Sequence, residues 1–235
     1  MIYQFSQSLV PAKFIKRYKR FFADCQLEDG EIVTAHCANT GSLKSCFEEN
    51  GRVFLLKNDD PKKKLKYSWE LSQVSGQLVG INTSRPNLIF RLALEQHLIP
   101  AFSHNIEIKS EVKLGLNSRI DYVLTDNNQR KTFVEIKNVT MKIGDALCFP
   151  DSVTERGKKH LLELIECIKV GHLAYMFYFC NRSDGDYFRI AHEIDADYYR
   201  TLQYAMQCGV RVLAYRFRPV GKGFIFDAKQ LSMEI

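Results

Sequence analysis

Short runs of strand length, separated by turns, fill the first eighty residues of the chain. Phe21–Leu27 and Glu31–His36 flank Asp29-Gly30, a dipeptide that is typical of a hairpin turn. Arg52–Leu56 and Gln77–Ile81 are further strand candidates. This pattern predicts a small all-β unit, and at this size a barrel is favoured over a sandwich.

The pattern changes at Asn82-Thr83-Ser84, where capping side chains precede Pro86, a residue suited to the first turn of a helix. From Asn87 to His97 the apolar residues recur at helical spacing. We therefore place a domain boundary near Asn82–Arg85. The predicted domains are residues 1–82 and residues 83–235.

Strands and helices alternate beyond this boundary, which predicts an α/β layer with right-handed crossovers and an α+β chain overall. Gly171 and Gly209 follow the last two predicted helices, at the position where a left-handed residue ends a helix. The predicted elements are the strands Ile120–Leu124 and Thr132–Val139, a helix from about Ser152 to Val170, the buried strand Leu173–Cys180, the helix Asp195–Cys208 and the strand Val210–Phe217.

Composition narrows the class of protein only a little. The chain is 46% hydrophobic and 26% charged, and it has no apolar run that could span a bilayer. Its N-terminus lacks the features of a signal peptide, so we expect a cytoplasmic protein. Seven cysteines without a CxxC pair argue against a disulfide framework or a thiolate zinc site. The net charge of +6 is compatible with a polyanionic partner.

Two acids and a lysine form the most informative constellation. Glu135 and Lys137 point to one face of a predicted strand, because side chains alternate across a strand. The preceding turn is expected to bring Asp121 close to Glu135 across the hairpin. Carboxylate oxygens suit Mg²⁺, and a lysine can orient water and offset charge on a phosphate. An ordinary solvent-facing Glu–Lys pair would give the same spacing.

The chain resembles the sugar fermentation stimulation protein A family over nearly its whole length. The motifs that carry the resemblance are Arg17-Tyr18-Lys19-Arg20-Phe21, His36-Cys37-Ala38-Asn39-Thr40-Gly41-Ser42, Trp69-Glu70-Leu71, Ile81-Asn82-Thr83, Ser110-Glu111-Val112-Lys113, Ser118-Arg119-Ile120-Asp121, Val134-Glu135-Ile136-Lys137, Phe149–Gly157 and Lys159-His160-Leu161.

This resemblance implies an N-terminal OB-fold-like β-barrel, followed by a mixed sheet flanked by helices that is similar to the PD-(D/E)xK nucleases. It implies DNA binding without strong sequence preference and a role in regulating sugar (maltose) metabolism. The nuclease motif falls on Asp121, Glu135 and Lys137 as catalytic residues, and the Ile136 carbonyl is a further metal ligand. Glu95 is the expected stand-in for an upstream acid, or else a solvated helix residue.

Basic residues beside aromatic ones are candidates for DNA contacts, because cations neutralise phosphates and rings stack on bases. A charged outer strand face would look the same. The candidates are Arg17, Tyr18, Lys19, Arg20, Lys63, Lys64, Arg156, Lys159 and His160.

The leading hypothesis is a DNA-binding protein with an Mg²⁺- or Mn²⁺-dependent nuclease site. A non-catalytic DNA-binding regulator on the same scaffold is the alternative, and a sugar-binding effector is a third class without a recognisable pocket. Whether the chain forms a homodimer stays open.

Overall fold

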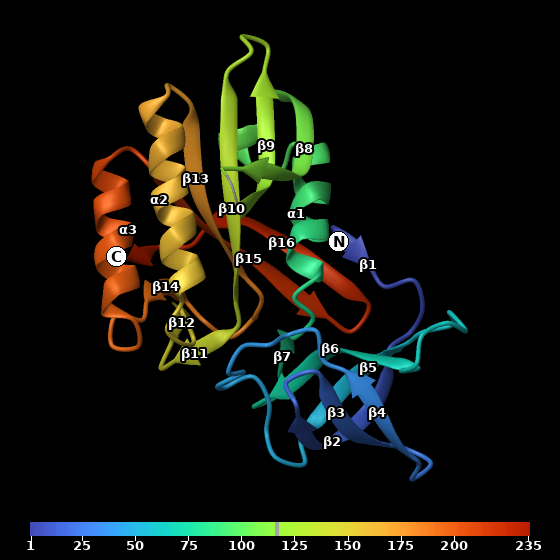
Figure 1. The fold of residues 1–235 in the computed structure, drawn as a ribbon. Coiled ribbons are helices and arrows are strands. Elements are labelled where there is room, and N and C mark those ends of the chain that lie inside the picture. Colours follow the sequence, from blue (N-terminus) through green and yellow to red (C-terminus); the bar gives the residue numbers. More distant parts are fainter. Residues whose placement is uncertain (116–117) are drawn as a thin grey trace.

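The computed structural model describes residues 1–115 and 118–235, and Figure 1 shows a β-barrel beside a larger layered domain. Five strands close the barrel, because β4 and β6 pair in parallel at Ala35–Tyr67 and His36–Ser68. The predicted OB-fold-like barrel is therefore confirmed. Its strands are β2 (Val10–Tyr18), β3 (Phe22–Leu27), β4 (Ile32–His36), β5 (Arg52–Lys57) and β6 (Tyr67–Val74), and β7 (Gln77–Gly80) extends the sheet from β6.

Strand β6 lies between the barrel and the layered domain, and it is not among the predicted strands. Trp69 is fully buried in the barrel core, whereas Leu71 packs in a core of the layered domain. Glu70, between them, is also buried. Burial therefore does not alternate along this strand, although apolar Tyr67, Trp69 and Leu71 alternate with polar residues in the sequence.

A seven-stranded mixed sheet forms the centre of the layered domain, in the order β1-β16-β15-β13-β10-β9-β8. Strands β10, β13 and β15 are parallel neighbours joined through helices α2 and α3, as predicted. The bounds are β1 (Tyr3–Gln4), β8 (Asn105–Leu114), β9 (Ser118–Asp126), β10 (Lys131–Val139), β13 (Leu173–Cys180), β15 (Arg211–Val220) and β16 (Gly223–Gln230).

Helices cover both faces of this sheet (Figure 1). Helix α1 (Arg85–Glu95) packs on one face over a core that contains Val134 and Ile136. Helices α2 (Glu155–Lys169) and α3 (Ala196–Gln207) pack on the other. A short 3₁₀ helix, Pro100–Phe102, follows α1. This is the predicted mixed sheet flanked by helices.

The second predicted helix begins later than expected. Thr154 caps α2, since its hydroxyl accepts a hydrogen bond from the Gly157 N–H at 3.0 Å, so the residues from Ser152 are not helical. A second, four-stranded sheet beneath the helices was not predicted, because its strands have only two to four residues. Its strands are β11 (Met141–Ile143), β12 (Ala146–Phe149), β14 (Tyr187–Ile190) and β17 (Met233–Glu234).

The first strand corrects the predicted division between residues 82 and 83. Tyr3 and Gln4 pair with Phe224 and Gly223 of β16, at the edge of the seven-stranded sheet. Ile2 and Phe5 are buried in the core beneath α1. The chain therefore starts in the layered domain, forms the barrel and returns at α1.

Several polar contacts fix the barrel against the layered domain. The Ser42 N–H and hydroxyl both donate to Asp151 Oδ2 at 2.9 Å. The buried guanidinium of Arg182 donates to the carbonyls of Ser45 and Thr140 and is paired with Asp184. In the described part of the chain, no helix is long and apolar enough to cross a membrane.

Candidate active site

Asp121 lies where strands β9 and β10 separate. The pairing of these two strands ends at Tyr122 and Val134. The Ile136 N–H, the next one of β10 that points toward β9, therefore has no partner on that strand's backbone. The Ile136 N–H donates instead to Asp121 Oδ2 at 2.7 Å. Asn87 of α1 donates its side-chain amide to Asp121 Oδ1 at 2.9 Å. Two elements thus hold this carboxylate in place.

The alternation of β9 reverses at Asp121. Ile120 packs in the core beneath α2 and α3, whereas Tyr122, two residues later, packs in the core beneath α1. On the neighbouring strand, Glu111 has a left-handed backbone with φ of 53°, which is unusual for a residue with a side chain. The side chains of the hairpin therefore change from one face of the sheet to the other at this point, and Asp121 is the residue of β9 where the change occurs.

Glu135 and Lys137 share one face of β10, as predicted, and this face is turned toward α2. Lys137 Nζ donates to Glu135 Oε1 at 2.7 Å, and only 3% of Glu135 is exposed. The same oxygen contacts His160 Nδ1 of α2. The second oxygen, Oε2, is buried and has no hydrogen-bond partner among the described residues.

His160 joins Glu135 to the start of α2. Arg156 Nε donates to His160 Nε2 at 3.4 Å, so Nε2 accepts a hydrogen bond and Nδ1 carries the ring proton in the neutral form. Nδ1 can then donate to Glu135. With 5% of its surface exposed, His160 is a buried partner of Glu135 that also lines the neighbouring cavities.

A cavity of about 300 Å³ collects these groups. Its lining residues are Thr83, Pro86, Asn87, Asp121, Glu135, Ile136, Lys137, Asn138, Arg156 and His160. Asn87 and Thr83 were not predicted as site residues, although both belong to the capping segment and first helical turn that the sequence marks. Thr83 also donates to the carbonyl of Ala38, so a barrel loop lies next to the cavity.

The structure does not bring Glu95 to this group. Its carboxylate is 44% exposed and pairs with Arg91 at 2.8 Å, one turn back on α1. Asn87 occupies the part of the helix that touches Asp121, and Glu95 lies about 12 Å further along the helix axis. The solvated alternative therefore describes Glu95.

The two acids have opposite pKa shifts. Burial, and then repulsion from Glu135, raises the pKa of Asp121 to about 6, against the hydrogen bonds from Ile136 and Asn87. Burial also acts to raise the pKa of Glu135, but the hydrogen bond from His160 and the charge of Lys137 outweigh it, and its pKa lies below the ordinary value.

Two carboxylates with an unpartnered buried oxygen fit a hard divalent cation. Mg²⁺ commonly uses one or two carboxylates and takes its remaining ligands from water and phosphate. Asp121 and Glu135 would hold it, together with the Ile136 carbonyl. In residues 1–115 and 118–235, no three His, Cys, Asp or Glu side chains converge as a metal cluster, so the cation would depend on those other ligands.

Replacing Asp121 by asparagine is expected to change how stability depends on pH. Folding raises the pKa of Asp121 from 3.8 to about 6. The protonated carboxyl group therefore contributes fully to the stability of the native protein below pH 4, and this contribution is lost as the pH rises through 6. The loss is at most about 3 kcal/mol. In urea unfolding with chelator present, the free energy of unfolding of the variant should rise relative to that of the native protein between pH 4 and pH 7. A difference that is constant across this range would contradict the assignment.

The remaining DNA-contact candidates lie in two places. Arg156 lines the cavity, and Lys159 lines a neighbouring pocket. On the barrel, Tyr18, Lys19 and Arg20 are exposed at the β2–β3 turn, and Lys63 and Lys64 are exposed in the loop before β6. Arg17 instead donates to the carbonyls of Arg20, Asn39 and Gly41, so its guanidinium organises the loop beside the cavity.

Comparison with known proteins agrees over both domains. Residues 15–81 match the model of the SfsA N-terminal OB domain, and residues 84–222 match that of the sugar fermentation stimulation protein RE domain. A sugar fermentation stimulation protein homolog of Geotalea uraniireducens is 45% identical over 94% of this chain and 95% of its own. One from Ruegeria sp. is 49% identical over 89% of this chain and 91% of its own.

A solved structure shares the fold. The structure of Pyrococcus furiosus SfsA in complex with Ca²⁺ superposes with a TM-score of 0.90, at 24% sequence identity. The match covers 100% of this chain and 99% of that one. The arrangement of barrel and layered domain is therefore that of a known structure.

Proposed function

The chain belongs to the sugar fermentation stimulation protein family, and from this premise we propose that it binds DNA and hydrolyses phosphodiester bonds with a divalent metal ion. The observation that carries the proposal is the group of Asp121, Glu135 and Lys137 in one cavity, with Glu135 Oε2 unpartnered. The Pyrococcus furiosus SfsA structure is a complex with Ca²⁺, which supports the choice of a hard divalent cation.

The chemistry follows from the charges in the cavity. A bound Mg²⁺ or Mn²⁺ would activate water and polarise the phosphate. Lys137, whose ammonium is within 2.7 Å of Glu135, holds a positive charge where the phosphate gains negative charge. His160 keeps Glu135 ionised and oriented, and Arg156 lies at the cavity to contact the substrate.

The barrel supplies a surface for the nucleic acid. Exposed rings of Tyr18 and Phe21 lie beside Lys19 and Arg20 at the β2–β3 turn, and exposed rings and cations are the groups that single-strand binders use. Lys63 and Lys64 add charge on another barrel loop. Because these contacts are to phosphates and ring faces, they would carry little sequence preference.

Cleavage assays with purified protein test the proposal. Labelled single- and double-stranded DNA should be cut with Mg²⁺ or Mn²⁺, and addition of chelator should remove the activity completely. The Asp121→Asn variant serves as the matched control for a contaminating nuclease, because it should bind DNA without cutting it. Absence of metal-dependent cleavage on every substrate would contradict hydrolysis.

One observation favours the alternative of a non-catalytic DNA-binding regulator. Both oxygens of Asp121 already accept hydrogen bonds from the protein, and Glu95 lies away from the cavity. Under this alternative the scaffold positions DNA, and a role in sugar metabolism would follow from binding alone. Binding that persists with no cleavage in Mg²⁺ and in Mn²⁺ would favour it.

A further inference from the structure

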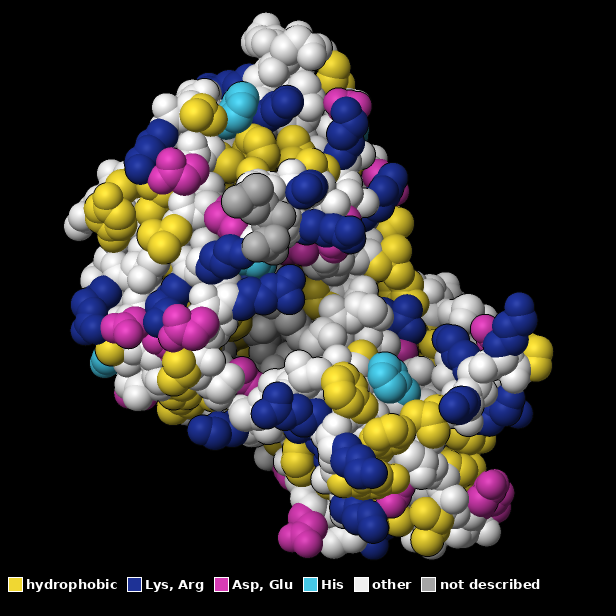
Figure 2. Space-filling model, viewed as in Figure 1, with side chains coloured by type: hydrophobic (Ala, Val, Ile, Leu, Met, Phe, Trp, Pro, Cys, Tyr) yellow, Lys and Arg dark blue, Asp and Glu magenta, His cyan; other side chains and the backbone are white. Residues whose placement is uncertain are grey.

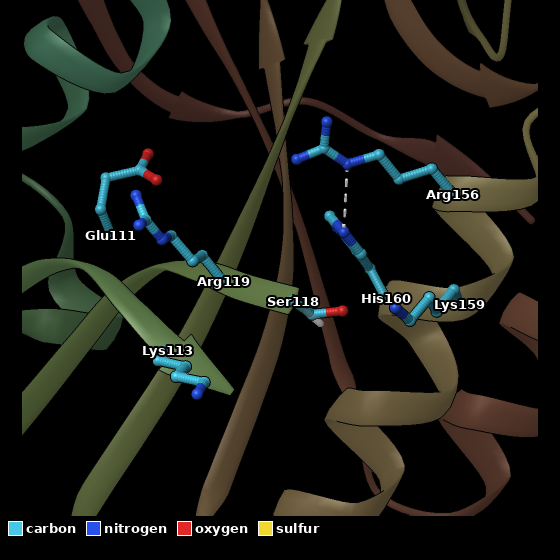
Figure 3. Close-up of a pocket in the computed structure, with 7 residues that line it drawn as sticks. All are labelled: Glu111, Lys113, Ser118, Arg119, Arg156, Lys159 and His160. Carbon is cyan, nitrogen blue, oxygen red and sulfur yellow. Dashed lines mark hydrogen bonds between the residues drawn. The ribbon is translucent and has the colours of Figure 1, made fainter. Parts of the chain in front are cut away.

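A second, larger cavity of about 820 Å³ lies beside the candidate active site. Figure 3 shows it between the β8–β9 hairpin and the first turns of α2. Its lining residues are Glu111, Lys113, Ser118, Arg119, Arg156, Lys159 and His160. Because Arg156 and His160 line both cavities, the two meet at these side chains. We call the larger cavity the basic pocket.

The basic pocket concentrates positive charge at a cost in stability. Lys113 and Arg119 are directly opposite each other on β8 and β9, and like charges in such cross-strand pairs repel. Among the described residues, no carboxylate lies within salt-bridge distance of either one. Arg156 faces them from α2, and the single acid of the lining, Glu111, points toward Arg119 in Figure 3.

The surface around the pocket has the same character. In Figure 2, Lys and Arg side chains surround the hollowed centre of the face between the layered domain and the barrel. Lys159 extends the positive charge along α2, where it is half exposed and only loosely paired with Glu163 at 3.8 Å. A polyanion entering the hollow would relieve the repulsion and exchange it for phosphate contacts.

We propose that the basic pocket binds the phosphate backbone of a single nucleic-acid strand that continues from the phosphodiester held at Asp121, Glu135 and Lys137. This proposal rests on the proposed function for the identity of the ligand. Pockets of about 300–1,000 Å³ enclose ligands of small-molecule size, so the volume suits a short stretch of one strand rather than a duplex. The β8–β9 hairpin and α2 form the two walls that guide it.

The test removes the opposed pair of charges and measures binding without catalysis. Lys113→Gln/Arg119→Gln is compared with Arg130→Gln/Lys131→Gln, which removes two exposed charges at the β9–β10 turn, roughly 20 Å along β10 from Lys137. Neither pair belongs to the proposed catalytic group. The pocket variant should be at least as stable as the native protein, because it loses a repulsion.

Binding of an oligonucleotide is measured in chelator over a series of salt concentrations, once as a single strand and once as a blunt duplex. For the single strand, the slope of log affinity against log salt should fall by about 0.7 for each lost phosphate contact in the pocket variant and stay unchanged in the control. The duplex slope should change much less. An unchanged single-strand slope, or an equal change for the duplex, would overturn the proposal.

Cleavage is scored separately in Mg²⁺. A native protein that binds with the predicted pocket dependence but cuts nothing would overturn the proposed hydrolysis and leave the pocket standing. If the native protein cuts DNA but the pocket variant keeps the full salt dependence of single-strand binding, the pocket proposal is overturned and the proposed hydrolysis stands.

Discussion

Replacing Lys137 by alanine is expected to lower the rate of metal-dependent DNA cleavage by roughly 10²–10³-fold, the usual effect of removing one group that stabilises charge in a transition state. Its ammonium is within 2.7 Å of Glu135 and faces the cavity with only 13% of the side chain exposed. Arg156 is the other cation of that lining, but its Nε donates to His160, and no second lysine lines the cavity among the described residues. Single-turnover cleavage of labelled DNA measures the effect.

Lys131→Ala is the matched control, because it removes the same side chain from the same strand at an exposed position. DNA affinity in chelator should change little in either variant, so that the loss is one of rate. If Lys137→Ala cleaves within tenfold of the native rate, Lys137 is not part of the catalytic group.

The largest expected effect on stability comes from Glu70. Its carboxylate is fully buried and accepts two hydrogen bonds from Arg85, at 2.7 and 2.8 Å, and one from Asn82. Glu70→Ala would leave the mostly buried Arg85 cation without its partner, which typically costs about 3–5 kcal/mol. The free energy of unfolding in urea should fall by that amount.

A double-mutant cycle separates the pair from the loss of packing. The cycle uses Glu70→Met, Arg85→Met and Glu70→Met/Arg85→Met. The double variant should be far more stable than the sum of the single losses predicts, because no uncompensated charge remains. Additive losses would contradict the pairing. Since Arg85 opens α1, Glu70→Ala should also slow cleavage by shifting Asn87, which holds Asp121.

The sequence predicts the parts of the fold that repeat a local pattern. Strand β13 and helix α3 lie at or within one residue of their predicted bounds, because each is a single uninterrupted apolar or amphipathic segment. Strand β8 has an alternation of Ile106, Ile108, Val112 and Leu114 that would have allowed its prediction. Strand β6 has the same kind of alternation, with Tyr67, Trp69 and Leu71 apolar, and it too could have been predicted.

The candidate site is predictable to the level of its strand face and no further. The alternation of β10 places Glu135 and Lys137 together, but it does not reveal that His160 would approach from α2, because that contact depends on how the helix crosses the sheet. Asn87 beside Asp121 is a contact between residues 34 positions apart. Glu95, chosen by its place in the helix, lies on a turn that does not reach the cavity.

The position of β1 has a practical consequence for dissecting the protein. The barrel is an insertion between the first and second strands of the layered domain, so cutting the chain after residue 82 would not release an intact second half. Such a fragment would lose Ile2 and Phe5 from its interior and expose the edge of β16, where other chains could add as strands. Supplying residues 1–6 ahead of residue 83 through a short linker should restore a folding unit.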